Sequence, residues 1–388
     1  MPTHRIGMAV CGLPREARGV AYTIQQMRSF LIFLAFLLVA TEAHAQWDIE
    51  ESHTTASLRG IHNVGGGVVW ASGTHGTVLR SEDGGYLWQS CNMPPGAEKL
   101  DFRGIQGWDE NTAIVMSSGA GDQSRLYKTT DGCQSWKLVF TNPDKDGFWD
   151  AIVFADRKKG FLLGDPVGGV FVLMGTNDGG DHWTRSTVKE LTSPGPQNGA
   201  FAASNSSLIL SGPPSFATGG PDGAFFYRGD VCTMGIHQED PAQCIRNGLS
   251  FERAKLPLNG ESKSSGAFSL ARSDSRILAV GGDYTKPDQG SGTAAYLDTH
   301  VGGWQLSSSN PMGYRSAVAY DPDQKLWITV GPNGTDISID DGKSWRPLKP
   351  SPTDAPDADK NWNALSLPFV VGPHGRIGRL RTISNASK

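Results

Sequence analysis

A motif that recurs at near-constant spacing constrains the fold of this chain more than any other feature. The pattern Ser/Thr-x-Asp-x-Gly-x-x-Trp, which we call the Asp motif, begins at Ser81, Thr129, Thr176 and Ser338, and the first three copies start 48 and 47 residues apart. A fixed period of this length indicates a repeat architecture. The motif residues are Ser81, Asp83, Gly85 and Trp88; Thr129, Asp131 and Trp136, with Cys133 replacing the glycine; Thr176, Asp178, Gly180 and Trp183; and Ser338, Asp340, Gly342 and Trp345.

A second pattern gives the number of repeats. An apolar residue, a polar one, a small one and then further apolar residues open a strand seven times. The polar member is in turn Arg59, Arg103, Asp150, Asn198, Ser265, Arg315 and Asn363, in steps of 44, 47, 48, 67, 50 and 48 residues. Each repeat has room for four short strands joined by glycine-containing turns, which is typical of a propeller blade. The sequence therefore predicts an all-β, seven-bladed β-propeller with four antiparallel strands per blade.

The two ends of the repeat region predict how the ring closes. We expect residues 46–388 to form one propeller, in which the last repeat, from Trp362 to Leu380, has room for only three strands. Residues 47–50 (WDIE) precede the first repeat and have no other place. We expect them to supply the missing outer strand, because this removes an exposed sheet edge. The single long step of 67 residues contains an insertion from Cys232 to Cys244 within blade 4.

The first 45 residues predict an export signal. An 11-residue apolar run from Phe30 to Ala40 follows Met27 and Arg28, and Ala43-His44-Ala45 forms a small-x-small cleavage pattern. A start at Met27 would give a signal of ordinary length. Because a membrane span needs about 20 apolar residues, we expect cleavage after Ala45, no permanent span, and a periplasmic or extracellular protein.

Cysteine usage agrees with export, since four cysteines remain after residue 45 and an oxidising compartment permits disulfides. The preferred pairings are Cys232 with Cys244 and Cys91 with Cys133. Neither spacing resembles that of a zinc site. We expect no metal and no cofactor.

Charge and motif content exclude several classes of function. The chain has 35 Lys+Arg against 39 Asp+Glu, a net charge of -4, which gives little support to nucleic-acid binding. The sequence contains no Gly-x-Gly-x-x-Gly opening a helix, no phosphate-binding loop, no His-Glu-x-x-His and no Gly-x-Ser-x-Gly. Dinucleotide, nucleotide, zinc-protease and serine-hydrolase chemistry are therefore disfavoured.

The motifs also resemble those of known propellers. The Asp motif resembles the Asp-box, or BNR repeat, of sialidases. The wider pattern, with Gly164-Asp165-Pro166, Gly281 to Tyr284 (GGDY) and Gly313 to Val318 (GYRSAV), resembles bacterial proteins related to the plant photosystem II stability/assembly factor. The resemblance implies a non-catalytic propeller that binds protein segments during assembly. It also implies that each Asp motif is a structural turn between third and fourth strands, away from the binding face.

The candidate binding face is where first strands begin and second strands end, around the channel. Three arginines from blades 1, 2 and 6 are expected on one side of this ring, and guanidinium groups bind carboxylates bidentately. We predict that this face binds a protein or peptide segment, such as an acidic tail or a C-terminal carboxylate. The alternative is that the arginines form buried salt links with neighbouring acids. The candidate residues are Arg59, Arg103, Arg315, Asp150, Asp165, Asp283 and Asn363.

An enzyme is the alternative function. Phe102-Arg103 is followed by Gly104-Ile105 without the proline typical of sialidases, and no Glu occurs after Glu261. A glycosidase could instead use two aspartates, and Asp150 with Asp165 or Asp283 is the pair to test. We predict a monomeric scaffold without catalytic residues, with glycan binding or sialidase-like glycoside hydrolysis as the alternative.

Overall fold

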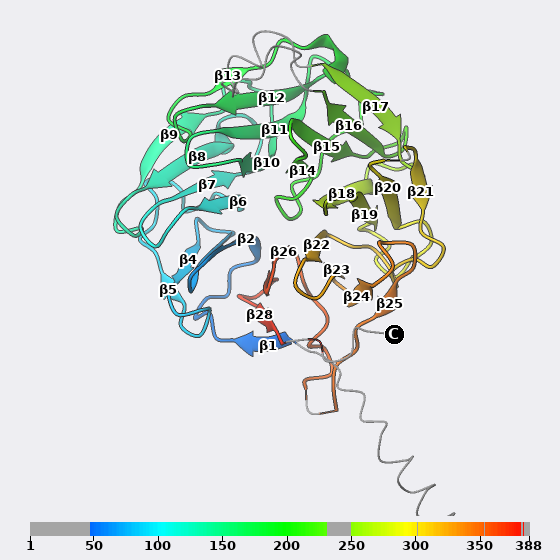
Figure 1. The fold of residues 1–388 in the computed structure, drawn as a ribbon. Helices are drawn as coiled ribbons and strands as arrows, with labels where there is room; N and C mark the ends of the chain where they lie inside the picture. The colour runs from blue at the N-terminus through cyan, green and yellow to red at the C-terminus, as the bar shows by residue number, and fades with distance from the viewer. Residues whose placement is uncertain (1–46, 231–249, 301, 353, 382, 384–388) are drawn as a thin grey trace, which may run out of the picture. The chain divides into compact units, whose positions relative to one another are not determined.

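The computed structural model describes residues 47–230, 250–300, 302–352, 354–381 and 383. Its seven antiparallel sheets, each of four strands, are arranged in a ring (Figure 1). The predicted seven-bladed β-propeller is therefore confirmed. The predicted signal segment 1–45 and the proposed Cys232–Cys244 pair lie outside the described residues.

Blades 1 to 4 are each built from four consecutive strands. The strands are β2 (Leu58–Gly65), β3 (Val68–Gly73), β4 (Val78–Ser81) and β5 (Gln89–Ser90) in blade 1; β6 (Phe102–Gly107), β7 (Ala113–Ser117), β8 (Arg125–Thr129) and β9 (Lys137–Thr141) in blade 2; β10 (Trp149–Phe154), β11 (Gly160–Val167), β12 (Val170–Thr176) and β13 (Thr184–Arg185) in blade 3; and β14 (Leu208–Leu210), β15 (Pro214–Thr218), β16 (Phe225–Gly229) and β17 (Phe251–Lys255) in blade 4.

Blades 5 and 6 follow the same rule, whereas blade 7 combines both ends of the chain. The strands are β18 (Ser265–Arg272), β19 (Arg276–Asp283), β20 (Ala294–Asp298) and β21 (Trp304–Leu306) in blade 5; β22 (Ala317–Asp321), β23 (Leu326–Gly331), β24 (Gly334–Ser338) and β25 (Arg346–Pro347) in blade 6; and β26 (Ala364–Ser366), β27 (Phe369–Val371), β28 (Ile377–Leu380) and β1 (Trp47–Glu50) in blade 7. Two short 3₁₀ helices, η1 (Gly121–Gln123) and η2 (Lys189–Leu191), lie in connections. No helix in these described ranges has the length and apolar character needed to cross a bilayer.

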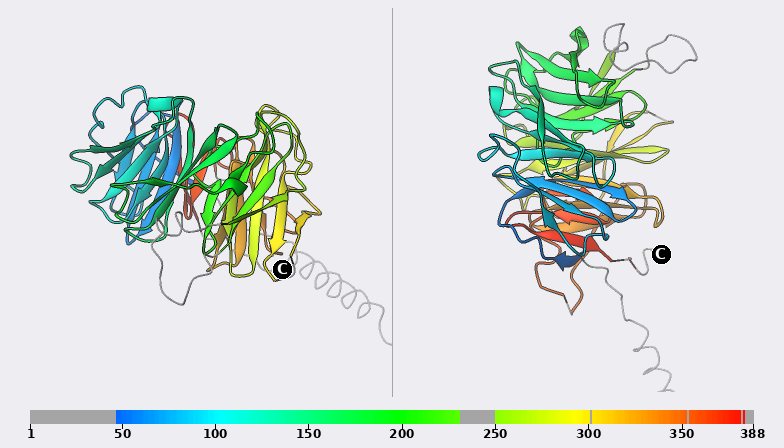
Figure 2. Two further views of the ribbon diagram at one scale, coloured as in Figure 1. Left: turned by 90° about the horizontal axis from the view of Figure 1, so that it is seen from above. Right: turned by 90° about the vertical axis from the view of Figure 1, so that its left-hand side faces the viewer.

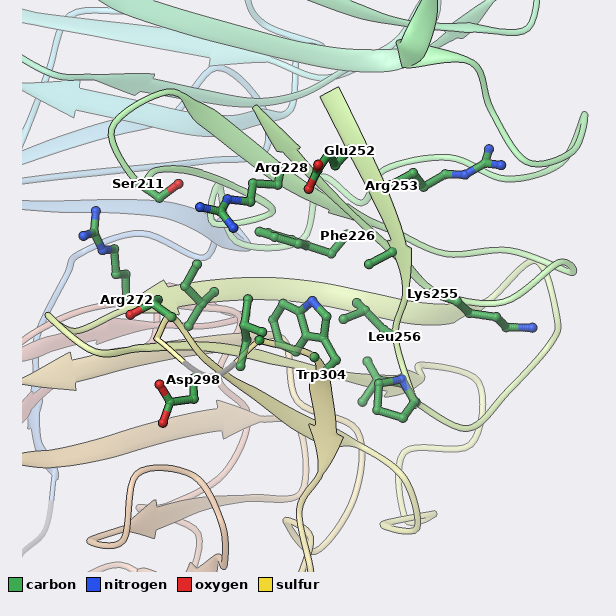
Figure 3. Close-up of a pocket in the computed structure, with 18 of the residues that line it drawn as sticks. Ser211, Phe226, Arg228, Glu252, Arg253, Lys255, Leu256, Arg272, Asp298 and Trp304 are labelled. Carbon is green, nitrogen blue, oxygen red and sulfur yellow. The ribbon is translucent and has the colours of Figure 1, made fainter. Parts of the chain in front are cut away.

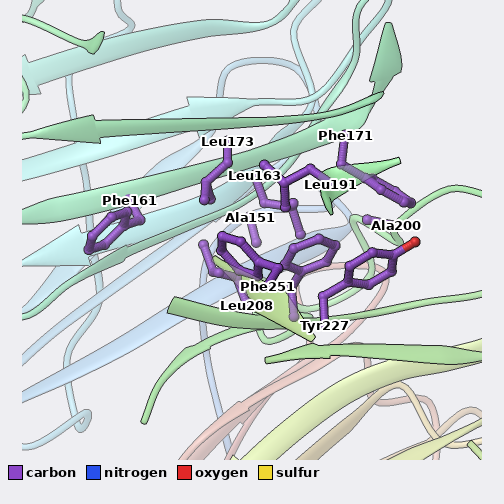
Figure 4. Close-up of a cluster of buried hydrophobic side chains, with 11 residues drawn as sticks. Ala151, Phe161, Leu163, Phe171, Leu173, Leu191, Ala200, Leu208, Tyr227 and Phe251 are labelled. Carbon is purple, nitrogen blue, oxygen red and sulfur yellow. The ribbon is translucent and has the colours of Figure 1, made fainter. Parts of the chain in front are cut away.

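The hydrophobic core is divided among the seven seams between adjacent blades. Figure 4 shows the seam between blades 3 and 4, where Phe161 and Leu163 of β11 pack with Leu208 of β14 and Tyr227 of β16. Six further clusters fill the other six seams. Each sheet therefore buries both of its faces against neighbouring sheets.

This arrangement explains why the inner strands are apolar throughout instead of alternating with polar residues. Successive side chains of a strand point to opposite faces of the sheet. In β7, Ala113 and Val115 face the seam with blade 1, whereas Ile114 and Met116 face the seam with blade 3. All five residues of β7 are buried.

The N-terminal strand closes the ring as the sequence predicted. β1 pairs with β28 in antiparallel register, with Trp47 opposite Leu380 and Glu50 opposite Ile377. Both Figure 1 and Figure 2 show β1, in blue, against the red strands of the last blade. The ring centroids of Trp47 and Trp362 lie 6.0 Å apart. Trp47 Nε1 also donates a hydrogen bond to Thr335 Oγ1 of blade 6, at 3.2 Å. Trp47 thus ties β1 to two blades.

Each of the four Asp motifs forms the turn between the third and fourth strands of its blade. In blade 6, the Asp340 carboxylate accepts hydrogen bonds from Ser338 Oγ and from the backbone and side chain of Ser344. Ser338 Oγ in turn accepts one from the backbone nitrogen of Gly342. Gly342 has a φ of 79° and packs against Leu278 of blade 5, where a Cβ would lie 2.5 Å from a leucine methyl group. The turn therefore joins neighbouring blades.

The motif of blade 2 uses a different link to its neighbour. Cys133 occupies the glycine position with a φ of 61° and forms a disulfide with Cys91, which follows the outer strand of blade 1. The structure thus contains the predicted Cys91–Cys133 pairing. The backbone nitrogen of Asn92 also donates to the carbonyl of Cys133. A covalent bond here replaces the packing that the glycine provides in blade 6.

Blade 4 differs from the sequence interpretation. Residues 197–200 do not open its first strand, because the first strand is β14, which begins at Leu208. Only an isolated bridge between Gly199 and Gly219 remains at the predicted position. Leu210 ends β14, and Ser211 and Gly212 lead into β15, which begins at Pro214. The repeat pattern failed here because residues 199–207 leave the sheet and cross the centre of the ring.

We predict that Trp47→Ala lowers the free energy of unfolding of the whole propeller by about 3–5 kcal/mol, the usual effect of truncating a buried tryptophan. The cause would be loss of the anchor that holds β1 on blades 6 and 7. Urea unfolding followed by circular dichroism measures the change. Ile49→Ala, on the same strand at a side chain that is 46% exposed, is the control and should change stability little. Equal effects of the two variants would contradict the anchor.

We also predict that Asp340→Ala lowers the free energy of unfolding by about 1–2 kcal/mol, because several hydrogen-bond donors of the turn lose their acceptor. The control is Asp323→Ala in the exposed β22–β23 turn, where the described residues show no hydrogen bond to the carboxylate. Thermal unfolding of both variants tests this. A stability unchanged by Asp340→Ala would show that the motif is dispensable for the fold.

Candidate functional site

A cavity of about 640 Å³ lies at the centre of the ring, lined by residues from all seven blades. Arg59, Arg103 and Asp150 reach it from the starts of β2, β6 and β10. Asp165 reaches it from β11, and Asn363 from just before β26. The structure therefore brings together five of the seven residues that the sequence nominated, at the face where first strands begin. We call this space the central cavity.

The two arginines of the central cavity share one carboxylate. Arg103 Nε donates to Asp101 Oδ2 at 2.8 Å, and Arg59 Nε lies 3.7 Å from the same oxygen. Arg59 Nε is buried and has no hydrogen-bond partner among the described residues. Burial and the adjacent charge of Arg103 lower the pKa of Arg59. Two guanidiniums against one acid leave a net positive charge, and both side chains remain partly exposed.

A pair of buried acids, Asp150 and Asp165, lines another part of the central cavity. Asp150 is 1% exposed, and its Oδ2 has no hydrogen-bond partner among the described residues. Asp165 Oδ1 accepts a hydrogen bond from the backbone nitrogen of Ala200 at 3.0 Å. Burial raises the pKa of Asp165 to about 6, and burial together with the nearby Asp165 raises that of Asp150. The pair therefore holds less than two negative charges near neutral pH.

Residues 199–207 of blade 4 cross the ring beside the cavity. The Asn205 side chain bonds to both backbone groups of Ile152 in blade 3, and Ser204 Oγ donates to the carbonyl of Ser316 in blade 6. Arg103 Nη1 donates to the carbonyl of Ala202 at 3.2 Å. The segment thus connects three blades and holds one of the cavity arginines.

Aromatic side chains supply the apolar part of the central cavity. Phe201 and Phe268 stack with ring centroids 3.8 Å apart, and Tyr314 meets Phe268 edge-on at 4.8 Å. Tyr284 and Trp362 complete this lining. The cavity therefore combines a cationic side with an aromatic wall, which suits a ligand that carries both a negative charge and an apolar group.

Arg315 does not line the central cavity, and this corrects the expectation of three clustered arginines. Its side chain is fully buried inside blade 6, where Nε donates to Asp336 Oδ2 at 2.8 Å and Nη1 to the carbonyl of Tyr314 at 2.9 Å. Asp336, on β24, is also fully buried. The alternative of a buried salt link thus describes Arg315, but with Asp336 as the acid. An internal acid on a third strand could not be recognised from the first-strand pattern.

Asp283 also lies apart from the central cavity. It ends β19, where its carboxylate accepts from the backbone and hydroxyl of Thr285 and lies 3.8 Å from Lys286 Nζ. These partners lower the pKa of Asp283. Of the two acid pairs proposed for hydrolysis, only Asp150 with Asp165 shares a cavity.

Sequence reasoning missed Asp101, Phe201 and Lys263. Asp101 lies two residues before Arg103, so proximity along the chain could have indicated it. Lys263 lines the central cavity from the connection before β18 and has no ion pair in the described part of the chain. Phe201 belongs to the segment that leaves the repeat pattern, so no periodic signal marks it. Within the described ranges, no group of three His, Cys, Asp or Glu side chains is placed to hold a metal.

Comparison with known proteins agrees with the resemblance inferred from sequence. No protein-family model matches the chain. The chain is 23% identical over 364 residues to the photosystem II assembly lipoprotein Ycf48 of Synechococcus sp. (strain CC9902), covering 90% of this chain and 91% of that protein. The solved structure of Ycf48 bound to a D1 peptide matches with a TM-score of 0.58 at 16% identity, over 87% of this chain and 97% of that one.

A glycoside hydrolase shares the architecture as well. The GH74 xyloglucanase from Xanthomonas campestris matches with a TM-score of 0.55 at 15% identity, over 88% of this chain and 55% of that one. At such identities the structural likenesses establish the fold alone. The chain is thus similar to Ycf48 over most of its length and has the propeller fold that Ycf48 and this hydrolase share.

The buried acids predict an unusual pH dependence of stability. An acid whose native pKa is about 6, against an ordinary 3.8, binds protons more tightly when folded, so the free energy of unfolding falls as pH rises between these values. Below both values the carboxyl is neutral in either state and has no effect. We expect Asp165→Asn, which can still accept from Ala200, to match wild type near pH 4 and to be more stable at pH 8.

Urea unfolding of both proteins across this pH range measures the difference. Asp323→Asn, at the exposed turn between β22 and β23, should give no pH-dependent gain over wild type. An Asp165→Asn variant that is less stable than wild type at pH 8 would contradict a carboxyl whose charged form is disfavoured by burial.

Proposed function

We propose that this protein is an exported, non-catalytic assembly factor whose central cavity binds an acidic peptide segment or a C-terminal carboxylate. The similarity to Ycf48, over about nine-tenths of each chain, supports a peptide-binding assembly factor. The solved Ycf48 structure described as bound to a D1 peptide shows that a related propeller takes a peptide ligand. The partner of the present chain would be a protein segment of its own host.

The observation that carries this proposal is the charge of the arginine pair. Arg59 and Arg103 face the central cavity with one carboxylate, Asp101, between them, and Arg59 Nε has no hydrogen-bond partner in the described residues. A ligand carboxylate would bind the exposed part of this guanidinium pair, since the two side chains are 31% and 27% exposed. Charge-assisted hydrogen bonds to guanidinium are among the stronger polar contacts in proteins. Lys263, at the same cavity, adds a third positive charge.

The shape and lining of the central cavity favour a short peptide end. About 640 Å³ is within the range of small-ligand pockets and takes a few side chains. Phe201, which stacks on the buried Phe268, and the exposed Tyr284 offer an aromatic surface to an apolar side chain next to the carboxylate. We infer that the ligand inserts an acidic or carboxylate group toward Arg59 and rests its apolar atoms on this wall.

Export and the monomeric state belong to the same proposal. The predicted signal segment before residue 46 and the Cys91–Cys133 disulfide are both consistent with an oxidising compartment outside the cytoplasm. The related Ycf48 is described as a lipoprotein. We propose a periplasmic or extracellular monomer.

Glycoside hydrolysis is the second candidate function, and one observation favours it. Asp150 and Asp165 share the central cavity with raised pKa values, as a general acid requires. A glycosidase of this type also needs an ionised carboxylate opposite the acid. Asp165, with a pKa of about 6, can supply that carboxylate at neutral pH. The peptide-binding function is the better supported one because the similarity to Ycf48 covers about nine-tenths of each chain.

The binding proposal predicts that Arg59→Gln/Arg103→Gln weakens capture of an acidic peptide with a free C-terminus by about 10- to 100-fold, which corresponds to about 1.4–2.8 kcal/mol. Fluorescence anisotropy of a labelled peptide, Asp-Glu-Ala-Leu-Ala with a free carboxylate, measures the affinity. Amidation of the peptide C-terminus should weaken binding to wild type. Lys137→Gln/Lys158→Gln removes two exposed charges elsewhere and should bind like wild type.

Equal binding by wild type and the arginine variant would overturn the proposed site.

The hydrolase candidate is tested separately, by incubating the protein with xyloglucan, aryl glycosides and sialosides. We expect no product. Turnover that is lost in Asp150→Asn would establish the enzyme instead.

A further inference from the structure

A second concave site lies on the outer rim, in the seam between blades 4 and 5. This groove, of about 1150 Å³, lies between β17 with the residues that follow it and β21 (Figure 3). We call it the blade 4–5 groove. No residue of the central cavity lines it.

The blade 4–5 groove exists because blade 5 lacks an intact Asp motif. In blades 1, 3 and 6, the motif glycine packs against the preceding blade: Gly85 against Phe369, Gly180 against Ile114 and Gly342 against Leu278. At the corresponding turn of blade 5, Gly302 and Gly303 have no atom within 4 Å of an added Cβ. The turn that elsewhere covers the seam therefore does not reach blade 4, and the seam stays open.

The floor of the groove is aromatic and aliphatic. Phe226 of β16 meets Trp304 of β21 edge-on, with ring centroids 5.1 Å apart. Leu256, Ile277 and Leu297 lie around them. Trp304 of blade 5 is only partly buried, as is Trp183 of the intact blade 3 motif, whereas Trp88 and Trp345 are 5% exposed. Phe226, Leu256, Ile277 and Leu297 are at most 8% exposed, so an apolar side chain of a ligand would contact Trp304, which these residues support from below.

Two unpaired arginines lie at one end of this floor. Arg228 ends toward Ser211, and Arg272 lies on the far side of that serine (Figure 3). Both residues are exposed, and within the described residues neither guanidinium has an ion pair or hydrogen bond. The nearby Asp298 pairs with Arg276, and Glu252, which lies opposite Arg228 across the strand pair, forms no ion pair with it. Among the described residues, this end of the groove therefore carries two arginines without a direct ion pair, with Glu252 as the nearest acid across the strand pair.

The other two basic residues of the groove have partners and point elsewhere. The Arg253 guanidinium donates to the carbonyl of Thr192 and lies over the Phe225 ring. Lys255 Nζ lies 3.4 Å from Glu261 Oε1. Figure 3 shows both directed away from Arg228 and Arg272. Arg253 and Lys255, both on blade 4, therefore serve as a control pair with the same total charge, because their side chains do not face the proposed ligand.

We propose that the blade 4–5 groove is a second peptide-binding site, for an acidic segment that presents a bulky apolar side chain. The apolar group would rest on Trp304, which packs on Phe226, and its acidic neighbours would meet Arg228 and Arg272. The arginines lie where first and third strands end, on the face opposite the central cavity. The two sites therefore bind different segments.

The test uses a labelled hexapeptide, Asp-Glu-Phe-Leu-Asp-Glu, acetylated and amidated so that it offers no terminal carboxylate. Fluorescence anisotropy at low and moderate salt measures its binding to the full protein. We expect Arg228→Gln/Arg272→Gln to weaken binding at least tenfold. Arg253→Gln/Lys255→Gln, with the same charge change, should bind within about twofold of wild type. The same loss on Arg228→Gln/Arg272→Gln should appear in an Arg59→Gln/Arg103→Gln background, in which the central cavity no longer contributes to binding.

A peptide with glycine in place of Phe and Leu should bind at least tenfold more weakly, since the apolar contact is lost. Circular dichroism confirms that each variant is folded. If Arg253→Gln/Lys255→Gln weakened binding as much as Arg228→Gln/Arg272→Gln, the effect would come from net charge alone, and the proposed site would be wrong. No binding of the hexapeptide at millimolar concentration would also overturn it. Two results would assign the groove to another ligand instead of a peptide. One is binding of a sulfated oligosaccharide, but not of the hexapeptide, that is lost in Arg228→Gln/Arg272→Gln. The other is self-association of this chain, measured by light scattering, that is lost in the same variant.

Discussion

Burial of both faces of every sheet is the constraint on which the rest of this structure depends. A single four-stranded sheet with β7-like strands would expose an apolar face on each side, so it is stable only between two neighbours. A row of such sheets ends in two unprotected faces, and a ring has none. The seven seam clusters show the result, since each is shared by adjacent blades. The pairing of β1 with β28 is the step that turns the row into a ring.

The ring also determines where binding chemistry can lie. Seven first strands converge on one axis, so polar residues at their starts are brought together although they are far apart in sequence. Buried charges are unfavourable unless they are paired, and the structure resolves this in three ways. Arg315 forms an internal pair with Asp336, whereas Arg59 and Arg103 share Asp101 and keep a net charge toward the cavity. Asp150 and Asp165 respond instead through raised pKa values. Only the second and third arrangements leave polar groups available to a ligand.

The sequence predicted the ring, its blade number and its closure, because these follow from periodic patterns and from the count of strands in each repeat. It also predicted the Cys91–Cys133 disulfide and five of the residues that line the central cavity. It could not separate Arg315 from Arg59 and Arg103, since all three occupy the same repeat position and differ only in whether an acid such as Asp336 faces them from a neighbouring strand. It misplaced the first strand of blade 4 because residues 199–207 keep a repeat-like composition but bond to other blades. A periodic sequence pattern predicts the features that all blades share, whereas these two sites depend on residues that differ from one blade to the next.

The meeting of both chain ends in blade 7 has a consequence for how the molecule acquires its structure. Trp47 and Leu380 are opposite each other in the ladder, so β1, the first of the described strands, can pair only after β28, the last of them, has been synthesised. Closing so large a loop is entropically unfavourable and slow compared with forming a local hairpin. Six blades can fold as their own segments emerge, but the seventh cannot. An incomplete chain therefore presents the unpaired edge of its final hairpin and an unclosed seam, the surfaces on which chaperones and proteases act.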